Sequence, residues 1–422
     1  MAKQHIAPRA LVADTNGQVY DHPHLLMVCR RGNQITLPRP DELIPLPPAS
    51  DLYLLPGRDA LGFDPETGSI ERLDEGNAVA GFVCPSYTLS ATTAYHANDH
   101  APVLPLFAYG AIGYAQGTLW VTAKQVDTDK RQVFSNIPCK KIEAGARKLM
   151  KTFPDNRLVT HLAKCALTYG CPAAKNFALG RFEAPLPTSQ ACNARCVGCI
   201  SLQPQDAGFP SSQNRITFRP TVQEICQVML HHNAREKRAV YSFGQGCEGE
   251  PLTEAKLIQQ SIARFRAKGG KGTVNINTNG SLPHTIEGLA HAGLSSIRVS
   301  LNSVRTDLYN AYYRPASFTF ADVTTTICQA KAHGLYVSLN YLFFPGINDT
   351  EAELDALLGF LEQTRPDFIQ MRNLSLDPDI YLARLPNQVE PSPSMGLTNL
   401  MKRIKKNCPW ITFGYFNPYV GG

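Results

Sequence analysis

The chain has 422 residues, of which 43% are hydrophobic and 18% are charged. This is an ordinary globular composition with ample material for a hydrophobic core. Chains beyond roughly 250–300 residues usually divide, so we expect more than one domain. The formal net charge of +6 is mild for this length, and it permits an anionic ligand or nucleic acid without requiring either.

The sequence disfavours two classes of protein, namely secreted proteins and membrane-spanning proteins. The opening residues, MAKQHIAPRA, contain no apolar core of a signal peptide. No stretch approaches 18 uninterrupted apolar residues. We therefore expect a cytoplasmic protein whose 12 cysteines are mostly reduced. Three of them are closely spaced, and in that compartment close spacing suggests a metal.

Residues 1–125 are predicted to form a β-rich N-terminal domain. Short apolar runs are separated there by Pro and Gly turns, and no periodic segment of helix length stands out. These runs are Leu25–Cys29, Leu52–Leu55, Ala80–Cys84 and Leu119–Ala123. Residues 126–184 are predicted to connect this domain to the next, with helices between about 139 and 176, where apolar residues recur at helix spacing.

From about residue 185 strand-like and helix-like segments alternate. The six strand candidates are Leu186–Gln190, Ala239–Phe243, Thr273–Thr278, Ser296–Leu301, Leu335–Leu342 and Phe368–Arg372. The main helix candidates between them are Thr221–Glu236, Thr253–Ala267, Phe320–Ala332 and Thr350–Glu362. Such alternation predicts an α/β fold with a parallel sheet, here an open partial (β/α)6 barrel over residues 185–385. Residues 386–422 are expected to form a short C-terminal extension.

The chemistry-bearing motif directly follows the first predicted barrel strand. Cys192, Cys196 and Cys199 have the spacing C-x3-C-x2-C. Three thiolates in one loop can hold three irons of a 4Fe–4S cluster and leave the fourth iron open to another ligand. Two alternatives are a structural zinc site and a cluster completed by a distant cysteine. A zinc site that used the upstream pair His96 and His100 would break the usual order and spacing.

This loop, placed after the first strand of a partial barrel, resembles the radical S-adenosylmethionine (SAM) superfamily. The resemblance covers about residues 185–375. Gly249 and Glu250 lie in a segment that is similar to the family's Gly-Gly-Glu-Pro motif, which contacts the amino group of SAM. A carboxylate suits that ammonium, and glycine lets the backbone approach closely.

Further candidate SAM contacts follow the later strands. Each of these motifs is weak alone, but their joint order at the carboxyl ends of strands matches the resemblance. The candidates are Asn277 and Asn279 beside a Thr-Asn-Gly-like segment, Arg298, Ser300 and Asn302 on the fourth strand, and Asn340 on the fifth.

Two positions depart from the family pattern. Gly198 precedes the third cysteine, where the family usually has an aromatic residue near the adenine. An apolar group from elsewhere in the chain that takes the place of this aromatic residue, or a different placement of SAM, would accommodate the change. Glu248 adds a second carboxylate to the Glu250 motif.

The resemblance implies a radical SAM enzyme in which the 4Fe–4S cluster reductively cleaves SAM to a 5′-deoxyadenosyl radical. It also implies an electron donor such as flavodoxin or ferredoxin, and a substrate that the sequence does not identify. We expect the N-terminal domain to cover the open side of the barrel or to present the substrate there. The alternative is an iron–sulfur module without catalysis that binds RNA or regulates. An interleaved basic and aromatic pattern, which would favour nucleic-acid binding, is missing from residues 1–125.

The remaining cysteines leave open the question of a second metal site. Cys165 and Cys171 lie close together just before the barrel and could join Cys139 or Cys408. We expect buried structural cysteines instead, and therefore one cluster per chain. Cys247 is expected to fill a tight turn as a small residue.

Overall fold

The computed structural model describes residues 6–386 and 392–421. Within this part of the chain, all regular elements before residue 126 are strands. The larger, mainly antiparallel sheet of nine strands comprises β1 (Arg9–Ala13), β2 (Val19–Met27), β5 (Leu43–Pro45), β6 (Asp51–Phe63), β7 (Ile70–Phe82), β8 (Tyr87–Leu89), β10 (Tyr95–Ala97), β11 (Ile112–Ala115) and β12 (Thr118–Gln125). A smaller sheet comprises β3 (Cys29–Arg31), β4 (Gln34–Thr36) and β9 (Thr92–Thr93).

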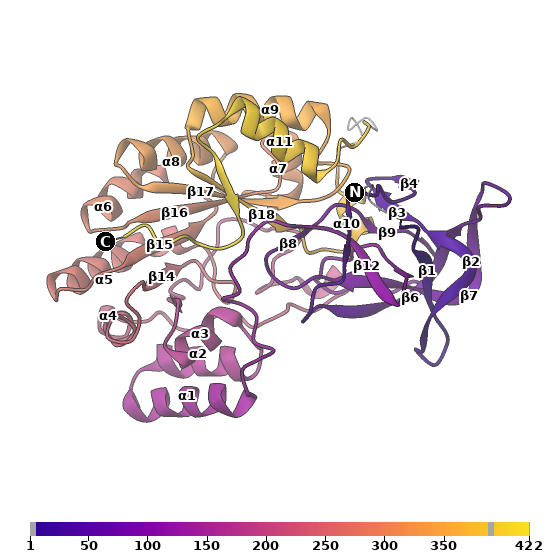
Figure 1. The fold of residues 1–422 in the computed structure, drawn as a ribbon. Coiled ribbons are helices and arrows are strands. Elements are labelled where there is room, and N and C mark those ends of the chain that lie inside the picture. Colours follow the sequence, from indigo (N-terminus) through magenta and orange to yellow (C-terminus); the bar gives the residue numbers. More distant parts are fainter. Residues whose placement is uncertain (1–5, 387–391, 422) are drawn as a thin grey trace.

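Three helices connect this β region to the barrel, as the apolar spacing predicts (Figure 1). They are α1 (Cys139–Thr152), α2 (Arg157–Leu167) and α3 (Pro172–Leu179). Asn156 caps α2 because its side chain accepts a hydrogen bond from the backbone N–H of Val159. Gly170, with φ +65°, and Pro172 turn the chain between α2 and α3.

The barrel is a sheet of seven parallel strands in sequential order, with helices in the crossovers. The strands are β13 (Glu183–Pro185), β14 (Val240–Phe243), β15 (Thr273–Thr278), β16 (Ser296–Leu301), β17 (Tyr336–Phe343), β18 (Phe368–Asn373) and β19 (Thr412–Gly414). The helices are α4 (Val222–Asn233), α5 (Ala255–Ala267), α6 (Ile286–His291), α7 (Thr306–Tyr313), α8 (Phe320–Ala332), α9 (Glu351–Thr364), α10 (Pro378–Ala383) and α11 (Leu397–Asn407). The residues described also include three short 3-10 helices, at Gln205–Ala207, Pro251–Glu254 and Pro283–Thr285.

The predicted partial barrel is confirmed, with three corrections. The first strand is Glu183–Pro185 and not Leu186–Gln190, because residues from Thr188 onward turn away to form the loop that carries the cysteines. The C-terminal segment adds β19, so the sheet has seven strands and not six. Helices α7 and α10 were not expected.

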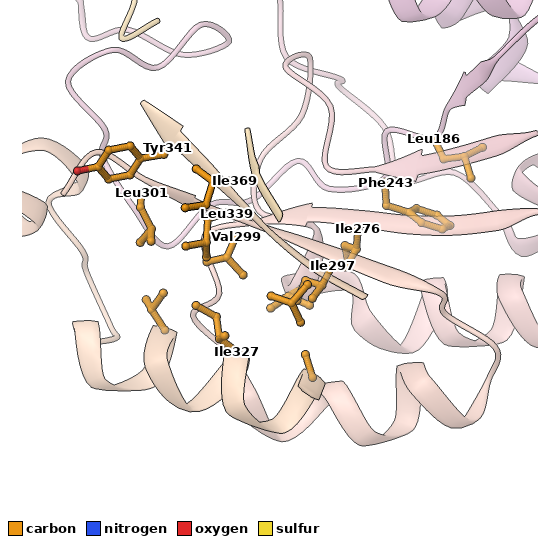
Figure 2. Packing of buried hydrophobic residues seen from close by; sticks show 14 of the residues in the cluster. Leu186, Phe243, Ile276, Ile297, Val299, Leu301, Ile327, Leu339, Tyr341 and Ile369 are labelled. Carbon is orange, nitrogen blue, oxygen red and sulfur yellow. The ribbon is translucent and has the colours of Figure 1, made fainter. Parts of the chain in front are cut away.

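The two faces of the barrel sheet differ in polarity, since successive side chains along a strand point to opposite faces. Apolar residues face the helices, and Figure 2 shows Phe243, Ile276, Ile297 and Ile369 among them. All four are at most 1% exposed. The alternate positions, which face the inside of the barrel, are polar: Ser242, Asn275, Asn277, Ser296, Arg298, Ser300, Ser338, Asn340 and Gln370.

The C-terminal tail crosses the inside of the barrel. Asn417 accepts a hydrogen bond from Gln370 of β18, with the two side-chain atoms 2.9 Å apart. Its amide also lies within hydrogen-bond distance of Glu183, Ser242 and Asn277 on β13, β14 and β15. One side chain thus joins the first three strands of the open sheet to β18.

The N-terminal domain docks on the carboxyl end of β18 and on the loops that follow β17 and β18. Leu89 donates its backbone N–H to Asn373, and the Thr88 hydroxyl donates to the carbonyl of Met371. Arg58 forms a buried ion pair with Asp377, at 2.8 Å. These loops lie at the same end of the parallel sheet as the cysteine loop that follows β13.

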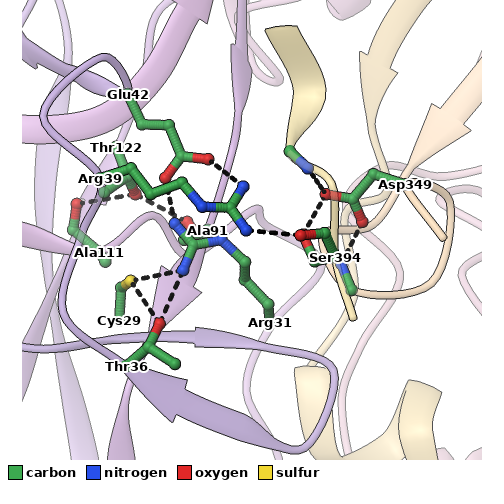
Figure 3. A network of polar contacts seen from close by, with 12 residues as sticks. Cys29, Arg31, Thr36, Arg39, Glu42, Ala91, Ala111, Thr122, Asp349 and Ser394 are labelled. Carbon is green, nitrogen blue, oxygen red and sulfur yellow. Dashed lines mark hydrogen bonds and ion pairs between the residues drawn. The ribbon is translucent and has the colours of Figure 1, made fainter. Parts of the chain in front are cut away.

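A second docking network, shown in Figure 3, joins three parts of the chain. Arg31 and Arg39 both pair with the buried carboxylate of Glu42. Arg39 also donates to the carbonyl of Ser394, and the Ser394 hydroxyl donates to Asp349, which follows β17. The network therefore ties the N-terminal domain to the barrel through the segment that precedes α11.

Among the residues described, no helix is both long enough and apolar enough to span a membrane.

Candidate functional site

The three motif cysteines lie in a loop that is held against the end of α7. Backbone N–H groups of Arg195 and Val197 donate to the carbonyls of Tyr313 and Tyr312, at 3.0 and 2.9 Å. Ala194 and Pro315 form an isolated β-bridge beside them. The loop is therefore fixed by backbone contacts, and its cysteine side chains remain available for a ligand.

None of the three cysteine side chains is fully buried. Cys192 is exposed, whereas Cys196 and Cys199 are partly exposed. Arg215 lies with its Nη2 3.6 Å from Cys199 Sγ. Burial, together with the neighbouring Cys199 and Cys192 thiols, holds the pKa of Cys196 well above its usual value.

Gly249 permits the loop after β14 to pack directly on the cysteine loop. Its N–H donates to the carbonyl of Ser189, and the N–H of Glu250 donates to the carbonyl of Ala191, each at 2.8 Å. A Cβ at Gly249 would lie 1.9 Å from the Ala191 carbonyl oxygen. Any other residue would push the two loops apart.

Glu248 holds these loops together through its carboxylate. Backbone N–H groups of Thr188, Ser189, Gly244 and Gln245 donate to it at 2.7–2.9 Å, and the Thr188 hydroxyl adds a fifth bond. Burial raises the pKa of this carboxyl. Glu248 is therefore fully engaged by donors within the protein.

Glu250 is also buried but has fewer partners. It accepts hydrogen bonds from the backbone N–H of Leu252 at 3.0 Å and of Asn279 at 2.8 Å, and from the Thr278 hydroxyl. Burial raises its pKa to about 7. Among the residues described, no Lys or Arg forms an ion pair with it, so a bound cation would be its natural counter-charge.

Asn279 and Asn277 connect the end of β15 to both loops. The Asn279 amide donates to the side chain of Asn193, which directly follows Cys192, at 2.9 Å. Asn277 donates to the carbonyl of Gly244 at 3.1 Å. Its own oxygen accepts from Asn275 at 2.8 Å, so its amide group is largely satisfied.

Three other candidates line the inside of the barrel. Asn340 donates to the Ser300 hydroxyl, and Arg298 donates to Gln370, each at 3.1 Å. Asn340 Oδ1 and Arg298 Nε are buried without a hydrogen-bond partner. Burial lowers the pKa of Arg298 to about 9. Unsatisfied buried polar atoms are rare in proteins and often mark the place of a ligand.

Asn302 lies apart from this group. Its side chain is fully buried and donates to the Leu308 carbonyl of α7 at 3.0 Å and to the Tyr381 hydroxyl of α10 at 3.3 Å. The structure therefore ties Asn302 to these two helices and not to Arg298, Ser300 or Asn340.

Helix α7 brings three tyrosines to the site that were missed in the sequence. Tyr309 and Tyr313 stack with ring centroids 4.5 Å apart, and both hydroxyls are buried without a partner. A Cβ at Gly198 would lie 2.7 Å from the Tyr312 hydroxyl oxygen, so Tyr312 occupies the space beside Gly198. The spacing of residues 309, 312 and 313 places them on one helix face, and this spacing could have indicated the tyrosine cluster from the sequence.

A comparison with protein families decides what this arrangement is. The model of the Radical SAM superfamily matches residues 186–358, which include the cysteine loop and the strands β14 to β17. Residues 186–358 form a radical SAM domain. The resemblance of its motifs to that family is thereby confirmed.

Curated relatives match part of the chain. A GTP 3′,8-cyclase from Heliobacterium modesticaldum is 32% identical over 162 residues, 38% of this chain and 46% of its own length. One from Helicobacter pylori is 27% identical over 185 residues, 44% of this chain and 52% of its own length. The chain thus spans about half the length of the curated relatives it matches. A solved structure of methylornithine synthase aligns with 15% identity and a TM-score of 0.36, over 65% of this chain and 77% of that one.

Radical SAM proteins use a 4Fe–4S cluster and SAM, and the residues present fit both groups. Three thiols in one fixed loop suit three irons of a cluster. Beside them lie a buried carboxylate without a cation and several polar atoms without partners: Glu250, Arg298 Nε, Asn340 Oδ1, Tyr309 Oη and Tyr313 Oη. This is the pattern expected of a site built for a charged, polar cofactor.

Proposed function

We propose that Cys192, Cys196 and Cys199 hold a 4Fe–4S cluster and that the protein is an enzyme that cleaves SAM reductively. When bound, the cluster supplies the electron that yields the 5′-deoxyadenosyl radical from SAM. The single observation that carries the proposal is the fixed three-thiol loop, which packs directly on the loop of Glu250. The substrate on which the radical acts is not assigned.

We further propose that Glu250 accepts the amino group of SAM. Its buried carboxylate has three hydrogen-bond donors but no cationic partner among the described residues, and an ammonium would satisfy its remaining acceptor capacity. Gly249 supports this placement, because it allows the backbone to approach the cysteine loop.

The remaining SAM contacts are proposed along the inside of the barrel. The atoms free to bind a ligand there are Arg298 Nε and Asn340 Oδ1, with the Ser300 hydroxyl beside Asn340. Asn277 and Asn279 contribute mainly by holding the loops in place. Asn302 is proposed mainly to position α7, since its amide N–H groups donate to Leu308 and Tyr381, while its Oδ1 is buried without a partner, as are Arg298 Nε and Asn340 Oδ1.

Partners follow from the chemistry. Reductive cleavage needs a one-electron donor, for which a flavodoxin or ferredoxin in the cytoplasm is proposed.

The N-terminal domain docks at the carboxyl ends of β17 and β18, and Val103 packs against the loop after the cysteines near Gly208. We propose that this domain helps to enclose the substrate. The family match favours an enzyme over an iron–sulfur module that only binds RNA.

The test is visible absorption of anaerobically reconstituted protein. Changing Cys192, Cys196 and Cys199 together to Ala should abolish the charge-transfer absorption of the cluster and the bound iron, which should be about four per chain in the unchanged protein. A matched triple variant, Cys84→Ala, Cys226→Ala and Cys328→Ala, removes as many thiols outside the loop and should keep the cluster. Full cluster content in the first variant would refute the proposal.

A further inference from the structure

Three metal-binding side chains from distant parts of the sequence converge behind the loop of Glu250. His161 and Cys165 lie one turn apart on α2, so they share a face of that helix. Cys247 lies in the loop after β14. The His161 Nε2 atom is 3.3 Å from Cys247 Sγ and 3.5 Å from Cys165 Sγ. All three ligand atoms lie within 4.8 Å of one another.

These distances fit a single metal ion. Around a tetrahedral zinc ion with bonds of about 2.0–2.3 Å, neighbouring ligand atoms are roughly 3.5–4 Å apart. The thiolates of an iron–sulfur cluster each bind a different iron, so they lie farther from one another. The geometry of His161, Cys165 and Cys247 therefore differs from that of a cluster site.

Cys171 is the candidate for a fourth ligand, but its thiol would have to move closer, because it is not among the ligand atoms that lie within 4.8 Å of one another. Gly170, with φ +65°, turns the chain so that the backbone N–H of Cys171 donates to the carbonyl of Cys165 at 3.0 Å. Cys171 packs in the same small cluster of side chains as Cys165 and Cys247. The other cysteines considered from the sequence lie elsewhere, because Cys139 is exposed at the start of α1 and Cys408 is buried in the barrel core.

Burial and ligand type also favour a metal ion. Cys165 and Cys247 are buried, and His161 is partly exposed. Thiolate and imidazole ligands in a tetrahedral arrangement select zinc among the common divalent ions. A closed set of four such ligands is typical of structural zinc sites, which stabilise the folds that hold them.

We propose that His161, Cys165 and Cys247 bind one Zn²⁺ ion, with Cys171 as the fourth ligand. The ion fastens the loop after β14 to helix α2. This loop carries Glu248 and Glu250, and its attachment otherwise depends on hydrogen bonds such as that from the Ile216 N–H to the Cys247 carbonyl, at 2.7 Å. The zinc site would thus connect the helical segment before the barrel to the site itself.

The experiment uses the full chain with Cys192, Cys196 and Cys199 changed to Ala, so that no iron–sulfur cluster contributes. Metal analysis of this protein should find about one zinc per chain. Adding His161→Ala and Cys247→Ser should remove the zinc, whereas adding Cys226→Ala, a buried thiol on α4, should not. Circular dichroism checks that each variant is folded. Because the cluster ligands are absent throughout, failure of this proposal is distinct from failure of the proposed function.

Cobalt provides a second, spectroscopic measurement. After chelation of the native metal, Co²⁺ added to the same protein should give the intense visible bands of a tetrahedral site with sulfur ligands. Cys171→Ala should lower the sulfur-to-cobalt charge-transfer band by about a third, because one of three thiolates is lost. An unchanged band would overturn Cys171 as a ligand. Absence of both zinc and cobalt binding, or a Cys165–Cys247 disulfide in freshly prepared protein, would overturn the site.

Discussion

The outer and inner faces of the barrel sheet are built on opposite principles. On the outer face, Phe243, Ile276 and Ile297 are fully buried against the helices and leave no polar atom to satisfy. On the inner face, Arg298 and Asn340 each keep one buried polar atom without a partner. Apolar burial stabilises a fold directly, whereas an unsatisfied polar atom destabilises it unless a ligand arrives. We therefore expect outer-face residues to contribute mainly to the stability of the fold and inner-face residues to contribute mainly to ligand binding.

Neighbouring residues of β14 allow the largest test of this division. Phe243→Ala should lower the free energy of unfolding by about 3–5 kcal/mol, because it opens a cavity on the outer face. Ser242→Ala, one residue away on the inner face, should lower it by about 0.5–1.5 kcal/mol, the loss of one hydrogen bond to Asn417. Urea denaturation under anaerobic conditions measures the free energy of unfolding of both variants. Equal losses of stability would contradict the division between the two faces.

The neighbouring carboxylates Glu248 and Glu250 allow a second test of the division between residues that stabilise the fold and residues that bind a ligand. Glu248→Gln should destabilise the fold by roughly 3 kcal/mol, because an amide cannot accept all five donors of the carboxylate. Glu250→Gln should instead weaken SAM binding tenfold to 150-fold, equivalent to about 1.5–3 kcal/mol. Isothermal titration of SAM and denaturation of each variant separate the two effects. A loss of SAM affinity confined to Glu248→Gln would reverse the assignment.

SAM affinity should depend on pH through Glu250. Burial raises the pKa of this carboxyl to about 7, so below that pH it must lose a proton to pair with an ammonium. Affinity should therefore rise by up to about tenfold per pH unit between about pH 5.5 and 7, and then level off. Without SAM, the same shift makes the folded state hold its proton longer than the unfolded state. Its contribution to stability therefore falls as pH rises from about 4.5 to 7.

Titrations of SAM at several pH values check this prediction, and Glu250→Gln is the control. The variant should bind SAM more weakly, with little dependence on pH in this range. An unchanged pH profile in the variant would show that another group controls binding.

Surface charges on the outer helices should matter least. Arg403 of α11 pairs with Glu351 of α9, with side chains 42% and 59% exposed. Exposed ion pairs contribute little, so Glu351→Ala should change the free energy of unfolding by no more than about 0.5 kcal/mol. Thermal unfolding measured against the unchanged protein checks this, and a loss comparable to that of Phe243→Ala would contradict the division.

Much of the barrel could be predicted from the sequence because its signals are local. The strands at Thr273–Thr278 and Ser296–Leu301 and the helix at Phe320–Ala332 have the bounds that the apolar pattern predicts. The capping box of Thr221 and Glu224 is present at the start of α4. Each of these features depends on residues within a few positions of one another.

The missed features depend on tertiary contacts. Strand β19 has only three residues, and it forms because β18 offers a free edge. The residues before the cysteine loop leave the sheet early, because Glu248 binds Thr188 and Ser189 from 60 and 59 positions away. Cys247 and His161 are 86 positions apart, so only the fold brings them together. The motif cysteines could be found because they lie within one loop.

The most direct test of the account is the release of 5′-deoxyadenosine. Protein with a reconstituted cluster is incubated anaerobically with SAM and dithionite, and the product is quantified by liquid chromatography. We expect 5′-deoxyadenosine from the unchanged protein and from Cys226→Ala, and none from the variant with Cys192, Cys196 and Cys199 changed to Ala. A cluster-loaded protein that binds SAM but releases no 5′-deoxyadenosine would contradict the proposal that it is a radical SAM enzyme of this kind.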